Sequence, residues 1–372
     1  MFGILLAGVA SLIAVIVVVG VSVRSELEAA LPLAISIQQS LVTGDEPQLE
    51  QDVEAFIDRS NAAADAVENP VWKLGERLPG IGPNLSAIST TARVARSVAE
   101  GAVGRATRIE VSAFRPVGGA IDVDAVLRSR PHVIAADATI HEAAKIMAQI
   151  DTRELIGPVS VPVIQLRREL ERVGEMTTGL SVAAELLPDA MGLTGPRNYL
   201  LIFPNTAELR SQGGNVTAFA TLSVENGVMS IMPRIDSAGA TPVFPESPLP
   251  LDPEIVALFG DHVGGSISTA TMLPDFPTTA ALMVKFAEQA YDMSLDGVVS
   301  IDPVALGYVL EAIGPVSLQD GSELTADNLV DVLLSEVYRR YPDGADQDAF
   351  YTGVGSLIAL AVVSGQGSFF DL

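Results

Sequence analysis

The residue types best suited to chemistry gather in one short segment near the middle of the chain. Asn205 to Gly214 reads NTAELRSQGG and lies between two runs of strand character. Arg210 carries a planar guanidinium that fits a carboxylate or a phosphate, and Gly213 and Gly214 permit close backbone approach or a strained turn. Because functional residues concentrate on loops held by a sheet, the segment is a candidate anion site. The alternative is that Glu208 or another acid pairs with Arg210, and the loop only shapes a crossover between strands.

Other catalytic and metal-binding chemistries lack the residues they need. The chain has no cysteine, which excludes disulfides, thiolate metal sites and a cysteine nucleophile. Its three histidines are scattered without the spacing of a zinc site. The sequence contains no G-x-S-x-G elbow, and Gly264-Gly265-Ser266 lacks the lysine of a Walker loop.

Charge excludes one class of partner. The chain has 22 Lys and Arg against 46 Asp and Glu, a formal net charge of -24. A phosphate backbone is attracted by clustered cations, so this balance opposes nucleic-acid binding. The region from residue 195 onward is the more acidic, with 6 basic and 22 acidic residues, which makes each of its arginines conspicuous.

The first segment predicts where the chain resides. Phe2 to Val23 carries no charged residue and is rich in Val, Ile, Leu and Ala. About 20 apolar residues cross a bilayer, and the pattern continues through Arg24 into further helix instead of ending at a small-residue cleavage site. Residues 2–23 are therefore expected to form an uncleaved transmembrane anchor. The membrane becomes a partner, and the bulk of the chain is expected outside the cytoplasm.

The elements that must position the candidate site fall into two regions. Residues 24–194 show apolar residues at helical spacing, interrupted at Pro and Gly, which predicts an all-α stalk. Residues 195–372 alternate strand and helix patterns, and Glu225-Asn226-Gly227 is a hairpin signal. The expected fold class is α/β, a mixed sheet with flanking helices, preceded by the transmembrane helix and the stalk.

Four motifs of the second region resemble a known family. They are N-x-x-E-L-R-x-x-G-G from Asn205, D-F-P at Asp275, D-G-V-x-x-I-D-P from Asp296, and G-P-V at Gly314. Together they resemble the actinobacterial "domain of unknown function" family four-zero-one-two across residues 195–363. Members of that family are often longer at the C-terminus, so the ending at Leu372 suggests a shortened chain. The family name implies no established chemistry.

The order of an arginine-containing loop, a hairpin and an I-D-P helix is also similar to the LytR-CpsA-Psr transferases. Those enzymes move cell-wall glycopolymers from a polyprenyl pyrophosphate carrier, and the resemblance implies their fold and a phosphoryl transfer assisted by Mg²⁺. Arg210 and Arg234 would clamp the pyrophosphate, and Asp236 or Asp275 would hold the metal. The R-S-D-T hallmark of those enzymes departs here to Arg210-Ser-Gln-Gly, which lacks the aspartate.

Each assignment has a structural alternative, and two functions remain open. Asp275 could cap the start of a helix, and Arg234 could pair with Asp236 or Glu225. The first function is an extracytoplasmic envelope protein that binds a lipid-linked glycopolymer or transfers it to the wall. The second is a non-catalytic envelope scaffold or interaction protein with a degenerate transferase fold. The second predicts a filled core at the loop and an exposed apolar patch on the helices.

Overall fold

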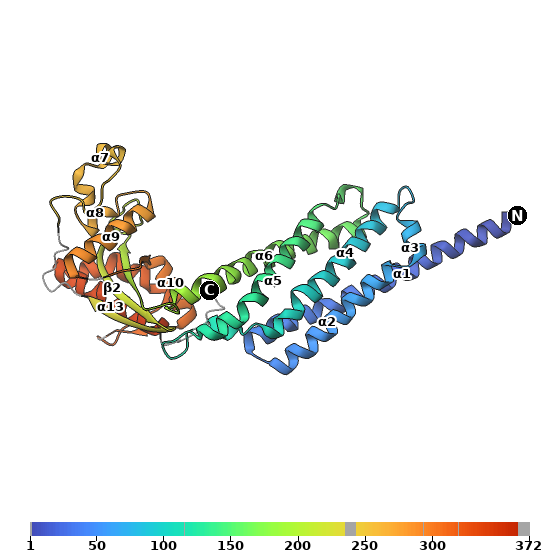
Figure 1. Cartoon of the computed structure of the whole chain (residues 1–372), viewed down its shortest axis with the longest axis horizontal. Coiled ribbons are helices and arrows are strands. Elements are labelled where there is room, and N and C mark those ends of the chain that lie inside the picture. The colour runs from blue at the N-terminus through green and yellow to red at the C-terminus, as the bar shows by residue number, and fades with distance from the viewer. Residues whose placement is uncertain (1, 115, 235–242, 293, 319, 364–372) are drawn as a thin grey trace. The chain divides into compact units, whose positions relative to one another are not determined.

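The chain folds into two compact units in the computed structural model. The structure describes residues 2–363 except 115, 235–242, 293 and 319. The first unit, here called the helical unit, comprises Met1–Phe114 and Asp124–Leu187, and the second, the sheet unit, comprises Arg115–Val123 and Pro188–Leu372. Figure 1 shows long helices in the first and strands in the second.

Two helices of the helical unit, α2 and α3, begin at residues whose side chains cap them. Asp45 precedes α2, and its carboxylate accepts the Gln48 N–H at 3.3 Å. Asn69 precedes α3 and accepts the Val71 N–H at 2.8 Å. Such caps satisfy backbone donors that the start of a helix leaves free. The α-helices are α1 Phe2–Thr43, α2 Glu46–Val67, α3 Pro70–Gly75, α4 Gly82–Gly101, α5 Val123–Ala148 and α6 Gly157–Ala190.

Separate apolar clusters, each shared by two or more helices, join the helices along the unit. Val94 of α4, Ile140 of α5 and Leu170 of α6 belong to one buried cluster. Ile37 of α1 and Val53 of α2 belong to another, near the turn that connects the two helices. Because burial of apolar surface stabilises by roughly 25 cal/mol per Å², these seams hold the long helices side by side.

The described apolar residues of α1 from Ile16 onward include a face that packs against protein. Val23 is buried, and Ile16 and Val19 pack with it in a cluster that contains Trp72 of α3. Across the part of the chain that the structure describes, no helix combines the length and apolar character that a membrane crossing requires. The prediction of a transmembrane anchor at residues 2–23 is therefore wrong for this structure. A run of Val and Ile suits an interface between helices as well as it suits lipid.

A four-stranded sheet in the order β3-β2-β1-β4 is the framework of the sheet unit. β1 (Arg197–Asn205) and β2 (Asn215–Glu225) are antiparallel, as are β2 and β3 (Val228–Arg234). β4 (Gly297–Ser300) runs parallel to β1. Asn226 and Gly227 turn β2 into β3 with φ values of 48° and 82°, which confirms the positive pair predicted from the Asn-Gly signal.

Helices cover both faces of this sheet. Leu200 and Ile202 of β1 contribute to a core shared with Phe286 of α9, whereas Phe203 packs on a second core shared with Leu310 of α10. The two faces follow from the alternation of side chains along a strand. The remaining elements of the unit are α7 Pro253–Phe259, α8 Ile267–Ala270, α9 Phe276–Tyr291, α10 Pro303–Ile313, β5 Val316–Ser317, β6 Glu323–Leu324, α11 Ala326–Asp331, α12 Val337–Arg340 and α13 Gly344–Val363.

The α/β fold class expected from the sequence is wrong for the chain, which is 68% helix and has few strands. After α10 the chain forms only the two-residue β5, paired with an equally short β6. β4 has four residues and gives way almost at once to α10, because the Asp302 side chain accepts the Ala305 N–H and starts the helix. The alternating pattern therefore marks short connectors between helices and adds no further strands to the sheet.

Candidate functional site

The segment singled out by its residue types lies at one edge of the sheet. β1 ends at Asn205 and its parallel neighbour β4 ends at Ser300, so both carboxyl ends lie at the same edge. Ligands of open α/β sheets commonly bind outside such an edge. The segment from Asn205 to Asn215, here called the clasp loop, leaves this edge and returns as β2.

Asn205 anchors the clasp loop by hydrogen bonds in two directions. Its side-chain oxygen accepts the Ala207 N–H at 3.0 Å, and its amide nitrogen donates to the hydroxyls of Tyr338 at 2.5 Å and Tyr351 at 3.3 Å. The Tyr351 hydroxyl donates in turn to the carbonyl oxygen of Leu333. Burial, followed by the contact with Tyr338, raises the pKa of Tyr351. This phenol is consequently a neutral, structural donor.

Leu333 lies in a π-helical turn, Val332–Glu336, between α11 and α12. Single π-helical turns occur frequently at functional sites, so this turn marks the same edge of the sheet independently of the clasp loop. Within this turn, the Leu333 carbonyl oxygen accepts a hydrogen bond from the buried Tyr351 hydroxyl. The turn thereby helps to hold Tyr351 beneath Asn205.

Arg210 and Glu208 do not pair with each other. The guanidinium of Arg210 donates to the backbone carbonyl oxygen of Ser268. Ser268 lies next to Asn215, the first residue of β2. Glu208 accepts the Asn215 side-chain N–H at 2.8 Å, and the Ser268 hydroxyl donates to the Asn215 side-chain oxygen at 2.7 Å. Arg210, Ser268, Asn215 and Glu208 therefore form one connected chain of hydrogen bonds that closes the loop onto α8.

Gln212 and the two glycines complete the fastening of the clasp loop. The Gln212 backbone N–H donates to Thr271 at 3.1 Å, and its side chain donates to the Leu273 carbonyl at 2.9 Å. Gly213 has a φ of 93°, which favours glycine. A Cβ at Gly214 would lie 2.1 Å from the backbone oxygen of Asn205. Both glycines predicted to permit an unusual backbone therefore do so.

The remaining predicted ligands are not brought to the clasp loop by any described contact. Asp275 caps α9 by accepting the Thr278 N–H at 2.9 Å and the Thr278 hydroxyl at 2.5 Å, and these bonds lower the pKa of Asp275. Arg234 ends β3 opposite Phe219, and its side chain lies outside the described residues, as does Asp236. Within the described ranges, no three His, Asp or Glu side chains come together as a metal site would require.

The core beneath the loop is nearly filled. A cavity of ≈ 20 Å³ lies among ten residues of β1, α10, the π-helical turn and α13, which is room for about one water molecule. Gly355 of α13 faces the ring of Phe203 so closely that a Cβ there would lie 2.9 Å from the ring. The residues lining the cavity are Phe203, Pro204, Asn205, Ile301, Pro303, Leu306, Leu333, Tyr351, Val354 and Gly355.

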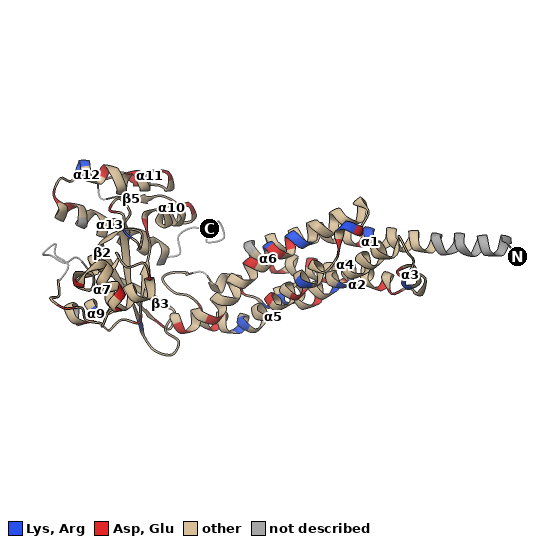
Figure 2. Cartoon of the chain, turned by 90° about the horizontal axis from the view of Figure 1, so that it is seen from above, with Lys and Arg blue, Asp and Glu red and all other residues tan. Residues whose placement is uncertain are grey.

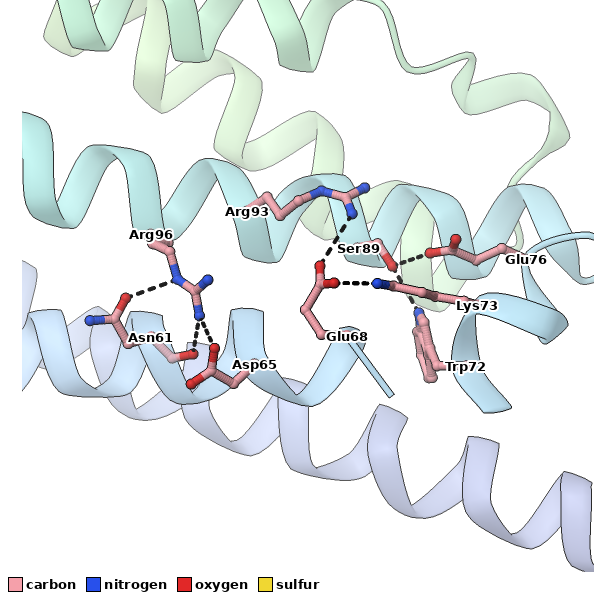
Figure 3. Close-up of polar contacts among 9 residues, drawn as sticks. All are labelled: Asn61, Asp65, Glu68, Trp72, Lys73, Glu76, Ser89, Arg93 and Arg96. Atoms are coloured by element: carbon pink, nitrogen blue, oxygen red, sulfur yellow. Dashed lines mark hydrogen bonds and ion pairs between the residues drawn. The ribbon is translucent and has the colours of Figure 1, made fainter. Parts of the chain in front are cut away.

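A second polar cluster, missed by the sequence analysis, lies inside the helical unit (Figure 3). Trp72, the single tryptophan of the chain, is fully buried and donates to the Ser89 hydroxyl at 2.8 Å. Ser89 donates in turn to Glu76. The lone tryptophan was the available signal, because a buried indole N–H needs a partner. Ser89 is itself fully buried, so this arrangement joins α3 to α4 and offers no accessible nucleophile.

Ion pairs extend this second cluster across the helices. Glu68 binds Lys73 of α3 and lies 3.8 Å from Arg93 of α4. Arg96 of α4 binds Asp65 of α2. Hydrogen bonds from Lys73 and attraction to the neighbouring arginines lower the pKa of Glu68. The cluster thus fastens α2, α3 and α4 to one another with charges that are satisfied internally.

The sheet unit matches a family of proteins without an assigned role. Residues 194–338, which include the clasp loop, match the model of a family described as "Protein of unknown function (DUF4012)". Comparison with curated proteins gave no match, and comparison with solved structures gave none. The similarity to LytR-CpsA-Psr transferases and an actinobacterial origin consequently stay predictions.

Proposed function

We propose that this chain is a non-catalytic interaction protein, and that the clasp loop is a structural device which presents a binding surface. The observation that carries the proposal is the hydrogen bond from Arg210 to the Ser268 carbonyl oxygen. The Nη1 group of this guanidinium closes the loop on its own chain. The side chains of Asn205, Glu208 and Gln212 in the loop are likewise engaged within the chain.

The side chain that the clasp loop leaves outside is apolar. Leu209 is 84% exposed and stands between Glu208 and Arg210, which are both bound to other parts of the sheet unit. Val243, 80% exposed, precedes Phe244, whose N–H donates to Gly265 at 2.7 Å. Both exposed side chains therefore stand next to backbone that is fastened to residues 265–268. Holding contact residues rigid lowers the entropic cost of binding.

Charge indicates the kind of protein partner. The region from residue 195 onward has 6 basic and 22 acidic residues, and Figure 2 shows few Lys or Arg among the acidic residues of the sheet unit. Arg210, one of those few, faces Ser268. Complementary charge speeds encounter and selects partners. A protein with a basic contact surface is thus the partner that suits the sheet unit.

The geometry gives less support to binding or transfer of a pyrophosphate-linked glycopolymer. Arg210 and Asp275 serve their own chain, and the cavity under the loop holds about one water. Calorimetric titration of inorganic pyrophosphate with Mg²⁺ into the full chain tests the difference, with Arg210→Ala as the variant. The proposal predicts no saturable heat for either protein. Saturable binding by the wild type that disappears in Arg210→Ala would overturn it and restore the transferase reading.

A further inference from the structure

An exposed apolar tip ends the helical unit at the connection between α3 and α4. Leu74, Leu78 and Ile81 are 56%, 40% and 46% exposed. The chain turns tightly between the last two, where Gly80 has a φ of 86°. The segment from Lys73 to Pro83 is here called the tip. Three exposed apolar side chains therefore gather around one tight turn of the backbone.

α1 runs beside the tip. Trp72 lies against Gly20 of α1, and a Cβ at Gly75 would lie 3.0 Å from the Ile16 side chain, so this part of α1 packs beside α3 (Figure 1). The exposed Val17, Val18 and Val21 lie on the other side of α1. The apolar surface of the tip is therefore formed by Leu74, Leu78 and Ile81.

Basic side chains border the tip, although the chain as a whole is strongly acidic. Lys73 and Arg77 lie on the tip, and Arg93 lies close enough to share Glu68 with Lys73. Arg77 is exposed and makes no ion pair with any described residue. Long basic side chains can lay their apolar stems along a surface while their charges remain at the level of phosphate groups.

We infer that the tip docks on the surface of a lipid bilayer, with Leu78 and Ile81 in the acyl boundary and Arg77 at the headgroup phosphates. Exposed apolar side chains flanked by Lys and Arg are the composition of segments that lie in a membrane interface. Lys73 and Arg77 outnumber the one acidic residue of the tip, Glu76, which accepts the Ser89 hydroxyl, so the exposed Arg77 supplies the charge that complements phosphate headgroups. This contact lies in the interface and needs no spanning helix. It does not depend on the role of the clasp loop.

A single-cysteine scan tests the contact, because the natural chain has no cysteine. The full chain carries Ile81→Cys labelled with an environment-sensitive fluorophore, and the matched control carries Val182→Cys on an exposed position near the other end of α6 in the same unit. Vesicles of phosphatidylcholine, with and without phosphatidylglycerol, are added to each. Docking predicts a blue shift for the label at residue 81 and none at residue 182.

Flotation of Leu78→Asp/Ile81→Asp with the same vesicles completes the test. Loss of two inserted side chains is expected to weaken vesicle binding at least tenfold, with circular dichroism and melting unchanged because both positions are exposed. An unshifted label, or equal flotation of the double variant, would overturn the inference and assign any vesicle binding to another segment. A dimer in light scattering that the double variant abolishes without vesicles would also overturn it, in favour of a second copy as occupant.

Discussion

Arg210 donates its guanidinium hydrogen bond to the backbone of Ser268, 58 residues further along the chain. The Ser268 hydroxyl binds Asn215, where β2 begins. Two residues far apart in sequence thus close a loop that the sequence marked as an anion site. The same side chain that could hold a phosphate instead links β1, β2 and α8. This relationship favours the proposed structural role of the clasp loop over the anion site that the sequence also predicted.

Replacing Arg210 by Ala should destabilise the sheet unit by about 2 kcal/mol, because a charged donor to a part-buried carbonyl is lost. Urea unfolding followed by circular dichroism measures the change. Arg168→Ala is the matched control, since Arg168 is exposed on α6 and bonds no described residue. Equal stability of the two variants would contradict the structural role of Arg210.

Gly214→Ala should cost more than 2 kcal/mol, since the new Cβ would meet the Asn205 carbonyl oxygen at 2.1 Å and force the clasp loop to shift. Gly179→Ala provides the opposite control. Gly179 is exposed within α6 and an added Cβ there meets nothing within 4 Å, so this change should stabilise by about 0.5–1 kcal/mol through helix propensity. Thermal melts of both variants separate the two effects, and a stabilised Gly214→Ala would refute the close approach.

Trp72→Phe should destabilise the helical unit by about 2 kcal/mol, because it removes the indole donor to Ser89 and leaves unfilled volume in a fully buried site. Unfolding by urea, followed by far-UV circular dichroism, provides the measurement. Tyr308→Phe serves as the control for loss of a polar group, because the Tyr308 side chain on α10 is exposed. An unchanged midpoint for Trp72→Phe would show that the cluster contributes nothing to the packing of α3.

Asp296 should contribute to stability that is lost in acid. The Asn198 backbone N–H, and then the Arg197 guanidinium, hold the pKa of Asp296 below its ordinary value of 3.8. A lowered pKa in the folded state means that the contribution is present above the ordinary value and disappears as the pH falls through the folded value. Unfolding free energies measured from neutral pH downward should therefore decline less steeply for Asp296→Asn. If the unfolding free energies of the wild type and Asp296→Asn fell equally steeply with decreasing pH, Asp296 would not be the source of the lost stability.

Local signals in the sequence predicted local structure well. The Asn226-Gly227 hairpin and the helix cap at Asp275 are confirmed, because each depends on neighbours within a few residues. Helical spacing did not indicate the break between α2 and α3, where Pro70 lacks the backbone donor needed to continue α2 and opens α3 instead.

Contacts between residues far apart in the sequence could not be predicted from local sequence patterns. Nothing in NTAELRSQGG indicates that Arg210 would find a carbonyl in α8 instead of an anion. The apolar run of α1 was likewise ambiguous, because Ile16 and Val19 serve a helix interface with the same residue types that serve a bilayer. Position in the fold, and not residue type, separates the alternatives in both cases.

Amide hydrogen exchange of the clasp loop, with and without pyrophosphate and Mg²⁺, tests the central claim most directly. The backbone N–H groups of Glu208, Gln212 and Asn215 donate to Asn205, Thr271 and Glu208 respectively. The structural role predicts that these amides are protected in the free protein and that adding the anion changes nothing. Rapid exchange in the free protein that slows when pyrophosphate and Mg²⁺ are added would contradict it, because the loop would then be organised by a ligand.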